Sequence, residues 1–205
     1  MSQAREARHY TSKDYFNWPD ALRCELIHGE VYDMTPAPSI GHQRLVRKLG
    51  YAIENAIQQR KSERGGDGGC ELLLSPVDVF LAEDTVVQPD LAVVCDPGKL
   101  ENGKYVDGPP DLVVEVLSPS TALKDRREKR SLYEAAGVAE YLIVDPVESY
   151  TEYYRLDSQG RYDRSTIWGP GDELALTLLP ELTTPLSELL GWPVPAVKES
   201  PMPYV

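Results

Sequence analysis

The fold of this chain is decided by the stretch Val86-Val87-Gln88-Pro89-Asp90-Leu91-Ala92-Val93-Val94 and by a second one, Asp111-Leu112-Val113-Val114-Glu115-Val116-Leu117. Nearly continuous apolar runs of this kind are typical of β-strands that are covered on both faces. Asp90 and Glu115 each interrupt such a run, and burial penalises an ionised carboxylate unless a partner compensates for its charge. Two such acids on neighbouring strands could share one divalent cation, so the pair indicates a metal site.

A helix is predicted directly after the second stretch, over Ala122–Ala136. At about 100° per residue, Asp125 and Tyr133 lie within roughly 60° of Lys129, on the apolar stripe that should face the sheet. A lysine on this stripe either extends past the edge of the core or is directed at an anion. Because the strand that carries Glu115 leads into this helix, we expect Lys129 to lie within reach of Glu115.

The rest of the pattern predicts an α/β fold, with a mixed central sheet flanked by helices. His28-Gly29 supplies a tight hairpin turn, and Ser39 opens a long amphipathic helix. The meander before the long central loop is expected to hold three strands, the last of them Val86–Cys95. We expect a single domain over residues 1–192, followed by a proline-rich tail over 193–205. The other expected strands are Glu71–Leu74, Val77–Ala82, Asp111–Leu117, Tyr141–Val144, Thr151–Leu156 and Tyr162–Trp168.

Composition narrows the classes of function. A formal net charge of −12 over 205 residues argues against a broad basic surface that coats nucleic acid. It still allows an enzyme that grips phosphate locally through a metal and a few basic residues. The densest basic cluster can equally be a solvated helix face. Its residues are Lys124, Arg126, Arg127, Lys129 and Arg130.

The cysteines and the apolar runs bear on the compartment. Cys24, Cys70 and Cys95 have no metal-ligand spacing, and the favoured interpretation is that of small buried thiols. No apolar run approaches the ~20 residues of a membrane span, and the segment Met1–Lys13 has no apolar core of a secretory signal. We therefore expect a cytoplasmic protein that does not cross a membrane.

These motifs resemble those of the PD-(D/E)XK nuclease superfamily and, within it, of the Uma2 family of putative restriction endonucleases. The resemblance covers roughly Tyr10 to Leu156, and its long central block is specific. It is carried by Glu25-Leu26-Ile27-His28-Gly29-Glu30, His42, Gln88-Pro89-Asp90-Leu91-Ala92-Val93-Val94, the block Pro110–Thr121, Lys129, Tyr133, Gly137-Val138, Glu140-Tyr141 and Val144-Asp145-Pro146.

The resemblance implies a restriction-endonuclease-like core and assigns roles to individual residues. Asp90 corresponds to the aspartate of the superfamily motif and Glu115 to its (D/E) position. The motif lysine would stand two residues further on, where this chain has Leu117. The resemblance implies that the following helix supplies this lysine as Lys129, and the helical stripe selects the same residue independently.

The chemistry needs these residue types. Asp90 and Glu115 would bind Mg²⁺, with Mn²⁺ as a possible substitute, through hard oxygen ligands. The metal would activate a bound water, and Lys129 would orient that water or neutralise the developing charge on the phosphate. Glu30 and His42 are auxiliary candidates. The alternatives are an exposed hairpin carboxylate for Glu30 and an ordinary core-facing residue at a helix start for His42.

The leading hypothesis is a metal-dependent endonuclease that acts on nucleic acid, with DNA as the favoured substrate. By analogy, cleavage of a duplex usually takes two active sites, which suggests a homodimer. Leu117 and the acidic charge favour an alternative, a nuclease-like domain that has lost cleavage and serves as a binding or assembly module. A small-molecule metal hydrolase is a third reading, because no DNA-recognition module is identifiable.

Overall fold

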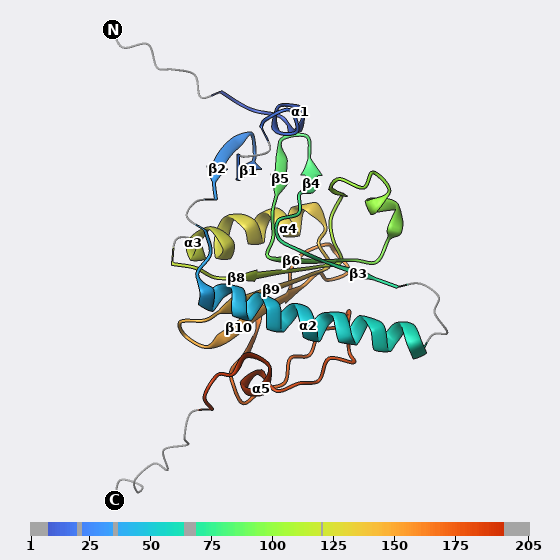
Figure 1. Cartoon of the computed structure of the whole chain (residues 1–205), viewed down its shortest axis with the longest axis vertical. Coiled ribbons are helices and arrows are strands. Elements are labelled where there is room, and N and C mark those ends of the chain that lie inside the picture. The colour runs from blue at the N-terminus through green and yellow to red at the C-terminus, as the bar shows by residue number, and fades with distance from the viewer. Residues whose placement is uncertain (1–7, 20–21, 35–36, 64–68, 120, 195–205) are drawn as a thin grey trace, which may run out of the picture.

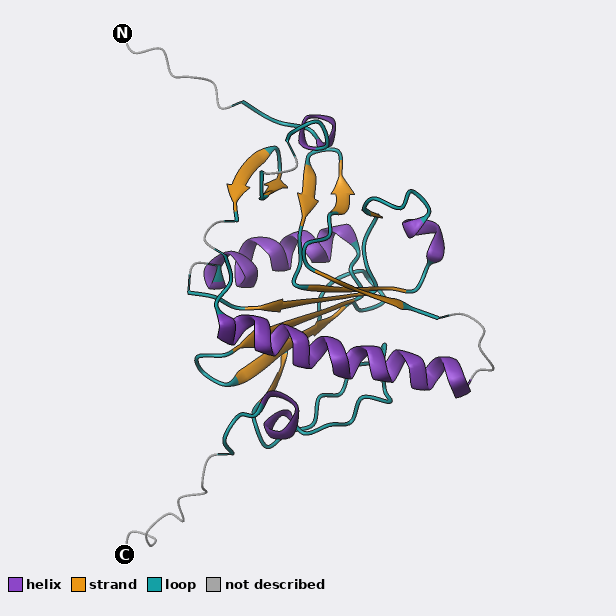
Figure 2. Ribbon diagram, in the orientation of Figure 1, coloured by secondary structure: helices purple, strands orange, loops and turns teal. Residues whose placement is uncertain are grey.

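The computed structural model describes residues 8–19, 22–34, 37–63, 69–119 and 121–194. Its centre is a six-stranded mixed sheet with helices on both faces, and a five-stranded mixed sheet lies beyond one of these helices (Figures 1 and 2). The six-stranded sheet has the order β11 (Thr166–Trp168), β10 (Tyr150–Arg155), β9 (Glu140–Asp145), β8 (Leu112–Val116), β6 (Leu91–Val94) and β3 (Glu71–Leu74). The five-stranded sheet has the order β2 (Glu30–Asp33), β1 (Cys24–Ile27), β5 (Thr85–Val87), β4 (Val79–Ala82) and β7 (Val106–Asp107).

One face of the six-stranded sheet is covered by α2 (Ile40–Glu63), the long helix expected after Ser39 (Figure 1). Its apolar stripe packs against alternate residues of β8, because successive strand side chains point to opposite faces. This periodicity places Leu112, Val114 and Val116 on the side of α2. It therefore places Val113 and Glu115 on the opposite side of the sheet.

The opposite face is covered by the helix expected over Ala122–Ala136, which is present but not uniform (Figure 1). It consists of α3 (Ala122–Lys124), a π-helical turn, η2 (Asp125–Lys129), and α4 (Arg130–Ala136). The helix ends at Gly137, whose φ of 88° is a left-handed conformation that glycine adopts at low cost. π-Helical turns inside α-helices occur frequently at functional sites.

The expected mixed central sheet is present, but a second sheet accompanies it, and the expectation of one strand over Val86–Cys95 is wrong. The first part of this run belongs to β5, which pairs with β1 and β4, whereas its second part is β6, which pairs with β3 and β8. The change of sheet falls at Gln88-Pro89-Asp90, where Pro89 has no N–H to donate to a strand neighbour. As a result, Asp90 lies where the two sheets part.

Other expectations are confirmed or corrected. The hairpin turn is present, with positive φ values of 50° at His28 and 76° at Gly29. The interpretation of Cys95 as a buried thiol is wrong, because Cys95 forms a disulfide with Cys70 across the β3–β6 pair. Cys24 is buried and free. Strand pairing brings the two sulfur atoms together, and sequence spacing could not show this.

The remaining elements lie outside the two sheets. The described chain also contains the short helices α1 (Ser12–Tyr15), η1 (Pro97–Leu100) and α5 (Leu186–Leu190). Residues 195–205 of the expected proline-rich tail lie outside the described residues. In the part of the chain that is described, none of the helices has the length and apolar character needed to cross a membrane.

Candidate active site

Asp90 and Glu115 line one cavity of about 810 Å³ at the edge of the six-stranded sheet, between α2 on one face and the π-helical turn on the other. The register of β6 with β8 explains this. Leu91 pairs with Val114 in an antiparallel ladder, so one further step places Asp90 opposite Glu115. The two acids singled out in the sequence therefore converge.

Lys129 is the cation at the bottom of this cavity. Its Nζ lies 2.8 Å from Oε1 of Glu115 and 2.8 Å from Oε1 of Glu25. It also lies 3.7 Å from Oδ1 of Asp125, the first residue of the π-helical turn. Only 4% of Lys129 is exposed. Lys129 thus lies beside Glu115, as its position on the apolar stripe of the helix predicts.

Glu25 is a site residue that the sequence reasoning missed. It lies on β1 in the middle of a fully buried strand. Its Oε1 accepts a hydrogen bond from the backbone N–H of Gln88 at 3.0 Å, and its Oε2 lies 2.6 Å from Nζ of Lys124. The signal was available, because Glu25 interrupts the apolar run of β1 just as Glu115 interrupts that of β8.

Two further groups fix the carboxylates. The hydroxyl of Tyr133, on α4, donates to Oε1 of Glu115 at 2.9 Å. The Nε2 atom of His42, in the first turn of α2, lies 3.1 Å from Oδ2 of Asp90. The same oxygen accepts the backbone N–H of Val116 at 2.8 Å. His42 therefore contacts a proposed metal ligand, in agreement with an auxiliary position rather than an ordinary one at a helix start.

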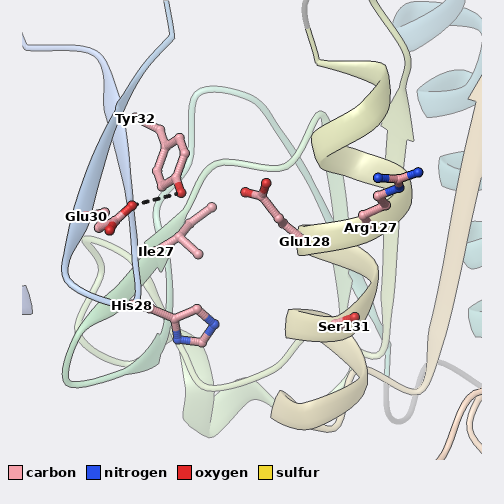
Figure 3. Close-up of a pocket in the computed structure, with 7 residues that line it drawn as sticks. All are labelled: Ile27, His28, Glu30, Tyr32, Arg127, Glu128 and Ser131. Atoms are coloured by element: carbon pink, nitrogen blue, oxygen red, sulfur yellow. Dashed lines mark hydrogen bonds between the residues drawn. The ribbon is translucent and has the colours of Figure 1, made fainter.

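Glu30 does not line this cavity. It lies exposed on β2, and its Oε2 accepts a hydrogen bond from the hydroxyl of Tyr32 at 3.3 Å. It lines a separate hollow of about 490 Å³ between the β1–β2 hairpin and the helix, into which Glu128 points (Figure 3). The hairpin therefore offers Glu25, and not Glu30, to the cavity.

Acids outnumber cations in the part of the cavity around Glu115. We call Glu25, Asp90, Glu115, Asp125, Lys124 and Lys129 the cavity cluster; it holds four carboxyl groups and two ammonium groups. Burial raises the pKa of Glu115 to about 8, and the charges of Asp125, Asp90 and Glu25 add to this against the opposing effect of Lys129. Burial likewise raises the pKa of Asp125. The cluster is therefore short of positive charge.

The pKa values of Lys129 and Glu25 shift in the direction that favours the charged form of each group. Burial alone would lower the pKa of Lys129, but Glu115, Glu25 and Asp125 hold it well above its usual range. Burial would raise the pKa of Glu25, but Lys129 and Lys124 outweigh it and the pKa is lowered. Both ions of the Glu25–Lys129 pair are therefore charged at neutral pH.

The oxygen donors of the cluster fit a magnesium ion that keeps water ligands. Within the described residues, no group of three or more His, Cys, Asp or Glu side chains could hold a metal ion by itself. Mg²⁺ is usually bound by one or two carboxylates, with waters and substrate phosphate completing its shell. In the same part of the chain, Oδ1 of Asp90 and Oε2 of Glu115 accept no hydrogen bond. Asp90 and Glu115 would be the residues that hold the ion.

Comparison with solved structures first defines the class of fold. The chain superimposes with a TM-score of 0.71 and 17% identity on the crystal structure of a putative nuclease belonging to DUF820 from Anabaena variabilis ATCC 29413. The match covers 89% of this chain and 98% of the other. The two chains therefore share a mixed α/β fold.

Comparison with protein families then gives the particular family. Residues 12–187 match the model of the Uma2 family, described as "putative restriction endonuclease", and the chain belongs to this family. Two relatives are the uncharacterized proteins sll1609 and slr1290 of Synechocystis sp. (strain ATCC 27184 / PCC 6803 / Kazusa). The first is 26% identical, and the match covers 77% of this chain and 85% of sll1609. The second is 29% identical, and the match covers 72% of this chain and 75% of slr1290. The family expected from the sequence motifs is confirmed.

Proposed function

We propose that this protein is a Mg²⁺-dependent endonuclease that hydrolyses phosphodiester bonds of nucleic acid, with DNA as its substrate. The observation that carries the proposal is the contact of Lys129 with Glu115 in a cavity that Asp90 also lines. This supplies the cation that Leu117 cannot supply. The family description agrees with the proposal but identifies neither substrate nor metal.

Each residue has a role that its contacts support. When bound by Asp90 and Glu115, Mg²⁺, or Mn²⁺ in its place, supplies an activated water and stabilises charge on the scissile phosphate. Lys129 keeps its proton next to Glu115 and offers a positive charge to the phosphate. Glu25 holds Lys129 in place from the opposite side. His42 holds Asp90 through Oδ2 and so leaves Oδ1 for the metal.

Plasmid cleavage with Mg²⁺ or Mn²⁺ tests this function. We expect nicked or linear product from the wild type and none from Asp90→Ala or from any sample with excess chelator. Arg127→Ala is the matched control, because Arg127 belongs to the same basic cluster but lines the hollow beside Glu30. Equal losses in Arg127→Ala and Lys129→Ala would mean that the cluster is a general phosphate patch, and would contradict the proposal.

The second candidate is a nuclease-like binding or assembly module without cleavage. The observation that favours it is the engagement of Lys129 by three carboxylates, Glu25, Glu115 and Asp125. A lysine held in this way contributes to the fold even where no substrate reacts. Tight DNA binding that needs no metal and is unchanged in Asp90→Ala would support this module over the enzyme.

Compartment and assembly belong to the same proposal. We place the protein in the cytoplasm; because disulfides are rare there, this placement requires that the Cys70–Cys95 disulfide be mostly reduced in the cell. Thiol alkylation followed by mass spectrometry of protein from cells would measure this. A homodimer would supply the second active site if both strands of a duplex are cut, and sedimentation would detect it.

A further inference from the structure

Two arginines at the cavity have no part in holding the carboxylates. Arg23 directly precedes β1, and Arg44 lies in α2; both are exposed and both line the cavity. Among the described residues, neither guanidinium group has a hydrogen bond or an ion pair, in contrast to Lys124, which pairs with Glu25, and Lys48, which donates to the carbonyl of Leu190. The cavity thus has uncommitted positive charge on two of its walls.

The groups that would react lie deep within this cavity. Only 5% of Glu115 and 4% of Lys129 are exposed. The N-terminal end of α2, α3 and the β1–β2 hairpin stand around the cavity, on one side of the molecule (Figure 1). To reach Lys129, a phosphate group of the substrate must therefore enter the cavity and lie below the surface of the protein. A duplex holds its phosphates on a stiff rod, whereas a flexible single strand can bend to bring one phosphate into a cavity.

The size and the lining of the cavity suit an unpaired strand. A volume of about 810 Å³ lies within the range of pockets that enclose a ligand of one or two nucleotides in size. Tyr32 and Met34, both half-buried, line its walls and offer aromatic and apolar surface to a base; one face of the Tyr32 ring is covered by the ammonium group of Lys124, 4.3 Å from the ring centre. Proteins that bind single strands combine such stacking surfaces with cations that follow the backbone. A protein with a net charge of −12 has no broad basic surface for a duplex.

We propose that the cavity takes an unpaired DNA strand, with Arg23 and Arg44 holding phosphates on the two sides of the phosphate that meets Lys129. This inference rests on the proposed function and narrows its substrate to single-stranded DNA or unpaired segments. One active site is then sufficient, because only one strand is cut.

The first test compares one end-labelled oligonucleotide as a single strand, as a full duplex and as a duplex with an unpaired central segment, each with Mg²⁺. We expect the single strand to be cleaved at least about tenfold faster than the full duplex. The duplex with the unpaired central segment should be cleaved within that segment, also at least about tenfold faster than the full duplex. Equal or faster cleavage of the full duplex overturns the inference and leaves the endonuclease function intact.

If none of the three oligonucleotides is cleaved, the proposed endonuclease function fails. The preference of the cavity for an unpaired strand is then tested by DNA binding. Fluorescence anisotropy with Ca²⁺ then compares the labelled single strand with the duplex. Preference for the single strand supports the inference, and equal binding or preference for the duplex overturns it.

The arginines are tested with a matched control on the same helix. Arg44→Gln should weaken binding of the single strand several-fold and should lower the slope of log K against log salt by about 0.7, the value of one phosphate contact. Arg47→Gln removes the same charge from α2 outside the cavity, and we expect no change. Equal effects of the two variants would overturn the assignment of a local phosphate contact to Arg44.

Discussion

Two neighbouring residues of the π-helical turn, Asp125 and Arg126, belong to two opposite electrostatic arrangements. Asp125 faces the cavity cluster, where acids outnumber cations. Arg126 faces the ends of β9 and β10, and its guanidinium lies 2.6 Å from Asp145, 2.7 Å from Glu152 and 2.6 Å from the hydroxyl of Tyr150. We call these four residues the Arg126 cluster.

The pKa values show what the difference means. In the cavity cluster, burial raises the pKa of Glu115 and of Asp125, because one lysine cannot compensate for all the acids near it. In the Arg126 cluster, burial would raise the pKa of Asp145, but the backbone N–H of Glu148 and the guanidinium of Arg126 outweigh it and lower the pKa. Two acids share one guanidinium group in the Arg126 cluster, so the clusters differ in depth of burial and in hydrogen bonding to the acids, and not in the ratio of acids to cations. In the cavity cluster, the Mg²⁺ ion of the proposed function would add positive charge beside Glu115 and Asp90.

The largest effect is expected from Lys129→Met. The substitution leaves Glu25, Glu115 and Asp125 buried without the ammonium group of Lys129. This should lower the free energy of unfolding by about 3–5 kcal/mol. Cleavage should also be lost. Urea unfolding measures the first effect, with Lys129→Arg as the variant that keeps the charge. A loss below about 1 kcal/mol would show that protonation already neutralises the cluster.

A smaller effect is expected from Arg126→Met in the Arg126 cluster. Its hydrogen bonds to Asp145 and Glu152 should contribute about 1.5–3 kcal/mol to the free energy of unfolding. Cleavage by the protein that remains folded should stay within a few-fold of the wild type. Arg127→Met, at the exposed neighbouring position, should change stability by less than about 0.5 kcal/mol. Loss of cleavage in stable Arg126→Met would break the distinction between the clusters.

The pH dependence without metal should distinguish the clusters by sign. The pKa of Glu115 rises from 4.5 to about 8 on folding, so its stabilising contribution is full below pH 4.5 and is lost as the pH rises through 8. Between pH 7 and pH 9 we expect a loss on the order of 1 kcal/mol. Glu115→Gln should abolish this loss. The lowered pKa of Asp145 contributes stability above its usual range, so the Arg126 cluster should not respond over this interval.

The smallest effect is expected from the metal. Mg²⁺ at five times its Kd should raise the free energy of unfolding by about 1 kcal/mol if it binds only the folded protein. Asp90→Ala should lose this gain, and thermal unfolding with and without Mg²⁺ measures both. An equal gain in Asp90→Ala would place the ion away from the cavity cluster.

Much of the fold could be predicted from local pattern. The apolar stripe of α2, the hairpin turn at His28-Gly29 and the buried strand β8 each follow from residues close together in the sequence. The same logic identified Asp90, Glu115 and Lys129, because a charged residue in an apolar stripe or strand must be buried near a partner. Glu25 carries the same signal on the buried strand β1, so the local pattern also contains the information that identifies it.

The tertiary structure alone decided which groups meet. Nothing local shows that the chain changes sheets at Pro89, that Cys70 lies beside Cys95, or that Glu25 reaches Lys129 across more than a hundred residues. The sequence determined by itself which residues are buried, because periodicity and side-chain polarity act over a few positions. The balance of charge in the cavity cluster was decided only by the packing of the two sheets and the helix, which brings β1, β8 and the π-helical turn together and depends on contacts across the whole chain.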